Sequence, residues 1–345
     1  MPLDKEKQDR IHALAQKTAF DYLPDDIAEH LASLEKEGGH MPYAHHSSLL
    51  NAPIETDLSK VDIALLGVPF DLGVTNRTGT RFGPKQMREM SYVALNGAPI
   101  HHVSNIAPFK NHTIRDIGDV PFKNHFSLEE GIAEIEAFYL KLLANNIIPI
   151  TAGGDHSITY PILKALGKDE PVGLIHFDAH ADTLGPMDGT KFHHGGPFLN
   201  AAIDGVIDPE RCVQIGIRGP ASSFWGFSHE SGMRVIHIEE FKEMGVEAVI
   251  AEARRVIGDV PTYITLDVDG IDPAYTPGTG TPEVGGMTPF EVQQVIRGLK
   301  GANLIGGDVV EVSPPFDPSG NTAMVAAKLM WEILCVVSDS QANKD

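Results

Sequence analysis

Short apolar runs alternate with amphipathic segments along most of the chain, beginning at Val61. Runs such as V-G-L-I-H-F suit parallel strands buried on both faces, whereas apolar residues three and four positions apart predict helices. The pattern predicts strands at 63–70, 147–150, 172–177, 212–217, 234–238, 261–266 and 303–310, and helices near 84–95, 128–142, 289 onward and 320–337. This alternation, without a Ser/Pro-rich linker, predicts a single three-layer α/β/α domain with a doubly wound, mostly parallel sheet.

Two of these helices begin with capping signals. Ser127 is followed three residues later by Glu130, and Thr288 is followed by Pro289 and then by Glu291. The first spacing is typical of a capping box, in which the two side chains satisfy each other's backbone N–H groups. The second marks a helix that starts at Thr288, with proline at its first position and glutamate at its third.

The first 60 residues lack the alternation, although two polar stretches, around 5–17 and 25–36, predict helices. We interpret residues 1–60 as an N-terminal arm or cap, residues 61–337 as the main domain and residues 338–345 as a polar tail.

Composition narrows the class of protein. The formal charge of −20 argues against nucleic acid and anionic membranes as partners and favours a small cationic ligand. No apolar run approaches 18 residues, and the first ten residues lack a signal peptide's apolar core. Cys212 and Cys335 lie in apolar segments, which predicts reduced core thiols and a cytoplasmic location.

Ionisable residues follow four of the predicted strands. Asp178, His180 and Asp182 alternate with alanines directly after a buried strand, so an extended backbone places the three on one side. His156, Asp267 with Asp269, and Glu311 follow three further strands. Two imidazoles and four carboxylates suit two divalent ions. Each motif alone fits a turn or helix cap, and their co-occurrence carries the hypothesis. We expect His176, inside the strand, to be a core residue.

Six motifs together resemble the ureohydrolases, the arginase and agmatinase superfamily, across residues 61–337. These motifs are G-G-D-H-S (153–157), D-A-H-A-D-T (178–183), H-G-G-P-F (194–198), L-D-V-D-G-I-D-P (266–273), P-G-T-G-T-P (277–282) and D-V-V-E-V-S-P (308–314). The resemblance implies an arginase-like fold and an enzyme that hydrolyses a guanidino compound to urea and an amine. It also implies two Mn²⁺ or Ni²⁺ ions per chain, a bridging hydroxide as nucleophile, and a homo-trimer or hexamer.

The resemblance assigns roles to individual residues. One ion would bind His156, Asp178, Asp182 and Asp267, and the other His180, Asp178, Asp267 and Asp269. Asp182 would also orient the nucleophile, His194 would relay a proton, and Glu311 would pair with the guanidinium.

The chain departs from the family pattern where the substrate is selected. Thr183 follows the metal motif, which disfavours arginine, and His194-Gly195-Gly196 replaces the usual H-G-T. We expect Asn76, Arg77, Asp188 and Gly196 to form part of the substrate pocket. Other segments look closest to the guanidinobutyrase and guanidinopropionase branch, so the preferred substrate is a linear guanidino acid. Free guanidine, a substituted biguanide such as metformin, and agmatine remain open.

Two rival hypotheses come from other classes. The chain would be a supporting subunit in a hetero-oligomer with a catalytic paralogue, although its full set of ligands argues against this. A deacetylase with one zinc ion fits poorly, because six ligands exceed what one catalytic zinc uses.

Overall fold

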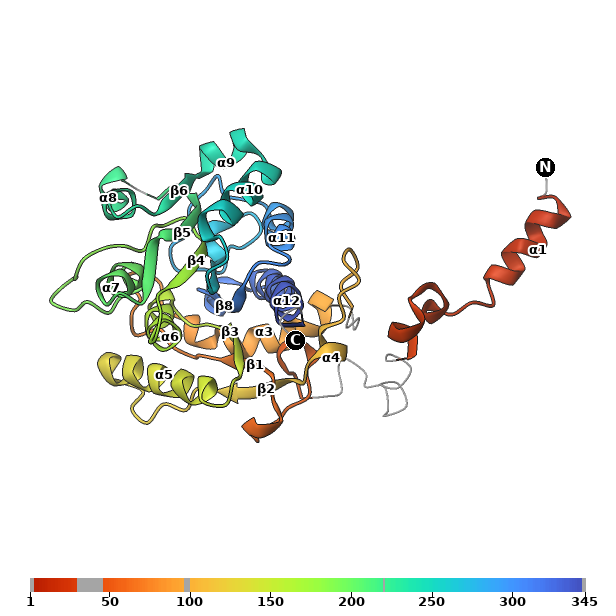
Figure 1. The fold of residues 1–345 in the computed structure, drawn as a ribbon, viewed down its shortest axis with the longest axis horizontal. Helices are drawn as coiled ribbons and strands as arrows, with labels where there is room; N and C mark the ends of the chain where they lie inside the picture. Colours follow the sequence, from red (N-terminus) through yellow and green to blue (C-terminus); the bar gives the residue numbers. More distant parts are fainter. Residues whose placement is uncertain (1–2, 30–45, 96–99, 220, 343–345) are drawn as a thin grey trace. The chain divides into compact units, whose positions relative to one another are not determined.

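A parallel sheet forms the centre of the computed structural model, which describes residues 3–29, 46–95, 100–219 and 221–342 (Figure 1). Within these ranges it has eight strands: β1 (Ile63–Gly67), β2 (Ile114–Asp119), β3 (Ile148–Ala152), β4 (Val172–Phe177), β5 (Ile207–Ile217), β6 (Arg234–His237), β7 (Thr262–Asp267) and β8 (Leu304–Val310). Their order is β2-β1-β3-β8-β7-β4-β5-β6, and every neighbouring pair is parallel. The predicted three-layer α/β architecture is confirmed.

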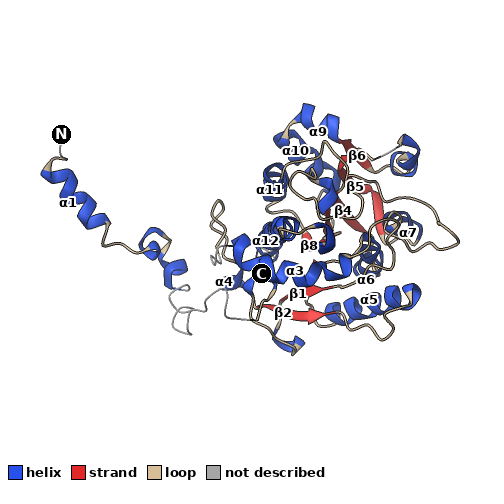
Figure 2. Cartoon of the chain, turned by 180° about the vertical axis from the view of Figure 1, so that it is seen from behind, coloured by secondary structure: helices blue, strands red, loops and turns tan. Residues whose placement is uncertain are grey.

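Helices cover both faces of the sheet (Figures 1 and 2). They are α3 (Gly83–Leu95), α4 (Pro108–Asn111), α5 (Leu128–Leu143), α6 (Thr159–Leu166), α7 (Pro197–Ile203), α8 (Gly226–Glu230), α9 (Ile238–Met244), α10 (Val246–Ile257), α11 (Pro289–Gly298) and α12 (Asn321–Ala342). One apolar core joins the sheet to α3, α10, α11 and α12 and includes Met87 and Trp331. A second core joins the other face to α5, α6 and α7 and includes Ile135 and Phe198.

The edge strand β2 is missing from the prediction. Its sequence, I-R-D-I-G-D, carries three charges in six residues and lacks the apolar run that marks the inner strands. Asp116 is buried here because Arg88 Nε and the backbone N–H of Leu49 each donate to its carboxylate at 2.8 Å. A polar strand is tolerated at this position because β2 is the last strand of the sheet, and its described outer neighbour is only a short bridge between Ile54 and Asp116.

The two predicted helix caps differ in the structure. Thr288 and Glu291 form a complete capping box at the start of α11. At α5, the Ser127 hydroxyl accepts the Glu130 backbone N–H, but the Glu130 carboxylate accepts a hydrogen bond from Asn124 instead of closing the box.

The structure divides the chain into two compact units. The chain divides into Met1–His46 and Ser47–Asp345. Residues 47–60 join the larger unit because Leu49 and Leu50 are buried. At the other end α12 continues to Ala342, and the Ser340 hydroxyl accepts the backbone N–H of Leu304 at 3.1 Å, so most of the expected tail is helical.

In the smaller unit the structure describes α1 (Lys5–Leu14), a 3₁₀ turn at Ala19–Tyr22 and a helical segment over residues 25–29. The helix predicted at 5–17 is therefore confirmed with an earlier end. The rest of the helix predicted at 25–36 lies outside the described residues.

Helix α12 is the one described helix long and apolar enough to cross a membrane. However, 78 % of its most apolar window is buried inside the protein, against α3 and β8. It is the central helix of the first apolar core, and Cys335 on it is buried and free, as is Cys212 in β5.

Candidate metal centre and reaction pocket

The predicted ligands converge at the carboxyl ends of four adjacent strands. His156 follows β3, Glu311 follows β8, Asp267 ends β7, and Asp178 to Asp182 follow β4. Because β3, β8, β7 and β4 are neighbours in the sheet and all parallel, these ends meet at one edge. The structure therefore brings together residues that are up to 155 positions apart in the sequence.

His156 points one ring nitrogen at three carboxylates. Its Nδ1 lies 3.1 Å from Asp178 Oδ2, 3.0 Å from Asp182 Oδ2 and 3.5 Å from Asp267 Oδ2. The opposite nitrogen, Nε2, lies 2.9 Å from the hydroxyl oxygen of Thr265. All these side chains except that of Asp182, which is 9 % exposed, are almost completely buried.

The Thr265 hydroxyl determines which nitrogen of His156 carries the proton. This hydroxyl donates to Asp308 Oδ1 at 2.5 Å, so it accepts from His156 Nε2–H. With the proton on Nε2, Nδ1 can offer its lone pair to an ion that the three carboxylates also bind, and it has no hydrogen-bond partner among the described residues. One imidazole nitrogen and three carboxylate oxygens therefore face one point, and such a set of ligand atoms fits a metal ion.

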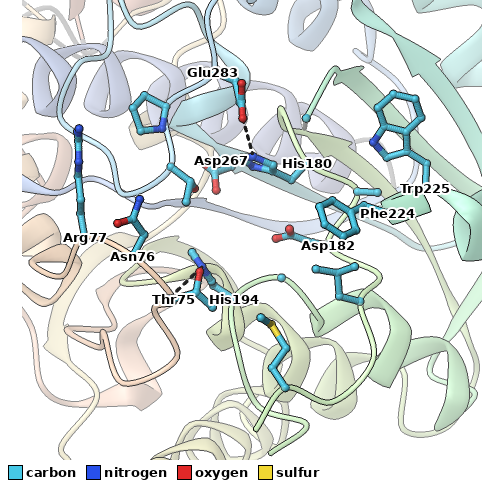
Figure 3. Close-up of a pocket in the computed structure, with 17 residues that line it drawn as sticks. Thr75, Asn76, Arg77, His180, Asp182, His194, Phe224, Trp225, Asp267 and Glu283 are labelled. Carbon is cyan, nitrogen blue, oxygen red and sulfur yellow. Dashed lines mark hydrogen bonds and ion pairs between the residues drawn. The ribbon is translucent and has the colours of Figure 1, made fainter. Parts of the chain in front are cut away.

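His180 forms the corresponding corner of a second group. Its Nδ1 lies 3.1 Å from Asp269 Oδ2 and 3.5 Å from Asp178 Oδ1, and these three side chains are close enough to share one ion. Its Nε2 lies 3.8 Å from Oε1 of Glu283 (Figure 3). A carboxylate on the far nitrogen of a ligating histidine is a common arrangement at metal sites, where it orients the ring.

The buried carboxylates of this cluster repel one another, and a positive charge between them would relieve the repulsion. Burial, Asp269 and Asp178 together raise the pKa of Asp267 well above its ordinary value. Burial and Asp178 raise the pKa of Asp269 to about 6 although His180 opposes the shift. Burial lowers the pKa of His156, but the surrounding carboxylates outweigh it and raise that pKa. Two divalent ions would balance the four aspartates, so the residues present fit a binuclear centre.

His176 is buried, as expected, but it also contacts the cluster. Its Nδ1 accepts from Gln214 Nε2 at 3.1 Å, so Nε2 carries the proton and donates to Asp178 Oδ2 at 2.7 Å. Its atoms are close enough to His156 and Asp178 to share an ion. Because both ring nitrogens already have partners and Phe198 packs against the ring at 4.4 Å, we assign His176 to holding Asp178 in place.

His194 and Glu311 form a pair next to the ligands. His194 Nδ1 lies 2.9 Å from Glu311 Oε1, which also accepts the backbone N–H of His156. Burial lowers the pKa of His194, but the Glu311 carboxylate outweighs it and raises the pKa to about 9. The other oxygen, Glu311 Oε2, is buried and has no partner among the described residues.

The loop after β1 holds His194 from the other side. Thr75 contacts His194 Nε2 through its hydroxyl at 2.6 Å and its backbone N–H at 3.2 Å (Figure 3). Asp155 supports this loop by accepting the backbone N–H of Gly73 at 2.8 Å, and Gly73 O accepts the N–H of His194. The nitrogens of His194 are therefore occupied by Glu311 and Thr75.

A cavity of about 460 Å³ opens above these residues (Figure 3). Asp182, Asp267, His180 and His194 line it together with residues from four distant segments: Thr75, Asn76, Arg77, Leu184, Met187, Gly219, Phe224, Trp225, Thr281, Pro282 and Glu283. Asn76 and Arg77 thus line this cavity, and the Arg77 guanidinium stacks over the Phe316 ring, 4.8 Å from its centroid.

Two predicted pocket residues lie elsewhere. Asp188 is exposed at a turn with φ of 47° and is outside the pocket lining. Gly196 is buried beneath the loop, where a Cβ would lie 2.9 Å from the carbonyl oxygen of Leu184. The close approach of two backbone segments therefore explains Gly196, and the missing hydroxyl of H-G-T does not shape the pocket wall here.

Sequence reasoning missed several residues of this site. Thr265 could have been found because it lies two positions before Asp267, on the same face of a strand. Thr75, Trp225 and Glu283 carry no comparable spacing signal, since only the fold brings their loops together.

Comparison with known proteins agrees with this geometry. The profile of the arginase family matches residues 61–336. The chain is 48 % identical to guanidinopropionase of Pseudomonas aeruginosa over 304 residues, covering 87 % of this chain and 94 % of that protein. It is 45 % identical to the mitochondrial agmatinase of Gallus gallus, covering 84 % and 85 %.

Among solved structures, proclavaminate amidino hydrolase of Streptomyces clavuligerus superposes with a TM-score of 0.83 at 32 % identity, covering 87 % of this chain and all of that one. The chain belongs to the arginase family, whose members hydrolyse guanidino C–N bonds at a binuclear divalent metal centre.

Proposed function

We propose that the preferred substrate is a linear guanidino acid of the guanidinopropionate or guanidinobutyrate type, which the enzyme cleaves to urea and an amino acid. The observation that carries this proposal is Arg77, an exposed cation at the rim of the same cavity as Asp182 and His194. A guanidinium bound at the carboxylates would leave the substrate carboxylate to reach this rim, where Arg77 can pair with it. The similarity to guanidinopropionase supports the same choice.

We assign one ion to His156, Asp178, Asp182 and Asp267 and the other to His180, Asp178, Asp267 and Asp269. When bound, the ions lower the pKa of a water molecule and stabilise negative charge that develops on the substrate. Both Mn²⁺ and Ni²⁺ accept this mixture of imidazole and carboxylate ligands.

The protein's own side chains position the reactants. Glu311 Oε2, which has no hydrogen-bond partner in the described part of the chain, is available to a guanidinium N–H, although Glu311 lies below the lining of the open cavity. Asp182 orients the attacking water and accepts its proton. His194 supplies a proton toward the leaving amine, and the Thr75 hydroxyl, 2.6 Å from Nε2, can pass this proton on, since both residues line the cavity.

Urea release from a panel of substrates tests the proposal. The Mn²⁺-loaded and Ni²⁺-loaded enzymes are given guanidinopropionate, guanidinobutyrate, agmatine, guanidine and metformin. We expect the highest kcat/KM for one of the two acids. If kcat/KM is highest for agmatine, guanidine or metformin, the proposed substrate is wrong. If no compound yields urea, the assignment of activity is wrong.

Two charged residues at the pocket separate the substrate classes. Arg77→Ala should raise KM for the acids at least about tenfold and leave KM for guanidine unchanged, whereas Arg77→Lys should keep most of the affinity. Glu283 carries the opposite charge, so Glu283→Gln should raise the KM for agmatine more than the KM for the acids. An equal loss for acids and guanidine in Arg77→Ala would show that Arg77 acts on the loop and not on the substrate.

We infer a homo-oligomer, as the family resemblance implies, and retain a hetero-oligomer with a paralogue as the alternative. Native mass spectrometry with metal analysis distinguishes them, because a supporting subunit would hold fewer than two ions per chain. A cytoplasmic location also stays a prediction.

A further inference from the structure

Two histidines outside the metal centre face each other through the same ring atom. Nε2 of His229, on α8, lies 3.3 Å from Nε2 of His237, at the end of β6. The rings are stacked with centroids 5.4 Å apart. His229 is exposed and His237 is half-buried, so the pair lies at the surface of the protein.

The surroundings of His237 select the form that binds metal ions. Its Nδ1 lies 3.2 Å from the backbone carbonyl oxygen of Ile217. A carbonyl only accepts, so Nδ1 carries the proton and Nε2 presents a lone pair toward His229. Histidines that bind metals usually have this arrangement, in which the far N–H is held by a carbonyl or carboxylate.

The spacing of the two nitrogens also matches a shared ion. In a tetrahedral site with metal–nitrogen bonds of about 2.0–2.1 Å, two ligating nitrogens lie about 3.3–3.4 Å apart. Without a metal ion, the proton on Nε2 of His229 bridges the same gap as a hydrogen bond. When a cation takes its place, the proton of His229 moves to Nδ1, so that both rings bind as neutral imidazoles.

We propose that His229 and His237 form a second metal site, separate from the catalytic centre and selective for Zn²⁺, Ni²⁺ or Cu²⁺. The selectivity follows from the ligands, because two neutral imidazoles bind late first-row ions much better than Mn²⁺. Water completes the coordination, since the site is open. A protein loaded with Mn²⁺ would therefore leave this site free.

The proposed site lies directly behind a wall of the reaction pocket. The indole ring of Trp225 packs against His237 with centroids 4.5 Å apart, and Trp225 also lines the cavity (Figure 3). An ion on the histidine pair would fix His237 and thereby the wall that Trp225 forms. The chain has two tryptophans, and the other, Trp331, is buried in the apolar core. The fluorescence of Trp225 therefore reports on metal binding at the histidine pair.

Fluorescence titration tests the proposal on the intact protein. The Mn²⁺-loaded enzyme is freed of excess metal and titrated with Cu²⁺, which quenches a nearby indole. We expect saturable quenching with one Cu²⁺ per chain beyond the catalytic ions, and competition by Zn²⁺. The single variant His229→Ala, at an exposed position, should weaken the binding of this extra Cu²⁺ at least about tenfold.

Three controls make the outcome unambiguous. His125→Ala removes an exposed histidine elsewhere and should leave the titration unchanged. Trp225→Phe should abolish quenching but retain the extra Cu²⁺ in equilibrium dialysis. Metal analysis of manganese after the titration shows whether Cu²⁺ has instead entered the catalytic centre. If His229→Ala binds Cu²⁺ like the unchanged protein, or if copper only displaces manganese, the proposed site does not exist.

Discussion

Replacing Thr265 by valine tests how the protein prepares His156 for a metal ion. The substitution keeps the shape of the side chain but removes the hydroxyl that accepts from His156 Nε2–H and donates to Asp308. Asp308 keeps two other donors, Thr159 at 2.9 Å and Tyr263 at 3.2 Å. His156 keeps none on that nitrogen, so the main cost falls on the imidazole.

The magnitude follows from that unpaired N–H group. A buried donor without a partner costs about 1–3 kcal/mol, and His156 is completely buried. The ring can avoid this cost by moving its proton to Nδ1, where the carboxylates accept it, but a protonated Nδ1 cannot bind a metal ion. We therefore expect Thr265→Val to lower the affinity for the ion at His156 about 10-fold to 100-fold.

The assay is the metal content of the protein after dialysis against a graded series of chelator concentrations. Thr265→Val should lose one ion per chain at lower chelator concentration than the unchanged protein, with a parallel loss of urea production. Thr265→Ser, which keeps the hydroxyl, should behave nearly as the unchanged protein. If valine and serine variants retain both ions equally, Thr265 does not control the tautomer of His156.

Further predictions concern the bridging ligand and the buried ion pair of α12. Asp178→Ala should lose both ions, because Asp178 faces His156 and His180, and full activity in this variant would refute the assignment. Burial raises the pKa of Glu332, but hydrogen bonds from Arg297 and His101 outweigh it and lower the pKa from 4.5 to about 2, which corresponds to about 3 kcal/mol. This stabilisation is present above pH 4.5 and is lost as the pH falls toward 2. Glu332→Gln should therefore lower the free energy of urea unfolding by about 3 kcal/mol at pH 7 and by much less at pH 2.5, and an equal loss at both values would contradict the charge argument.

The inner strands and the convergence of the candidate metal ligands could be predicted because both leave local signals. Buried parallel strands are continuous apolar runs, and Asp178, His180 and Asp182 follow such a run with a spacing of two. The edge strand β2 could not be predicted, because the burial of Asp116 in this strand depends on a hydrogen bond from Arg88, 28 residues away. The pocket wall is also non-local: Arg77, Trp225 and Glu283 share one cavity only because the sheet order places their loops together.

Asp182 and Glu311 both have strained backbone conformations, and at Glu311 the structure shows what the strain achieves. Both have positive φ, 50° and 64°, a conformation that costs non-glycine residues of order 1–3 kcal/mol. Glu311 directly follows β8, so an extended residue there would continue the alternation of the strand. The left-handed turn, fixed by the hydrogen bond from its N–H to Gly154 O at 2.8 Å, instead allows its carboxylate to reach His194 and the backbone of His156. Glycine would relieve the strain but would remove the carboxylate. A strained glutamate at this position is therefore explained by what its side chain contacts and not by the turn itself.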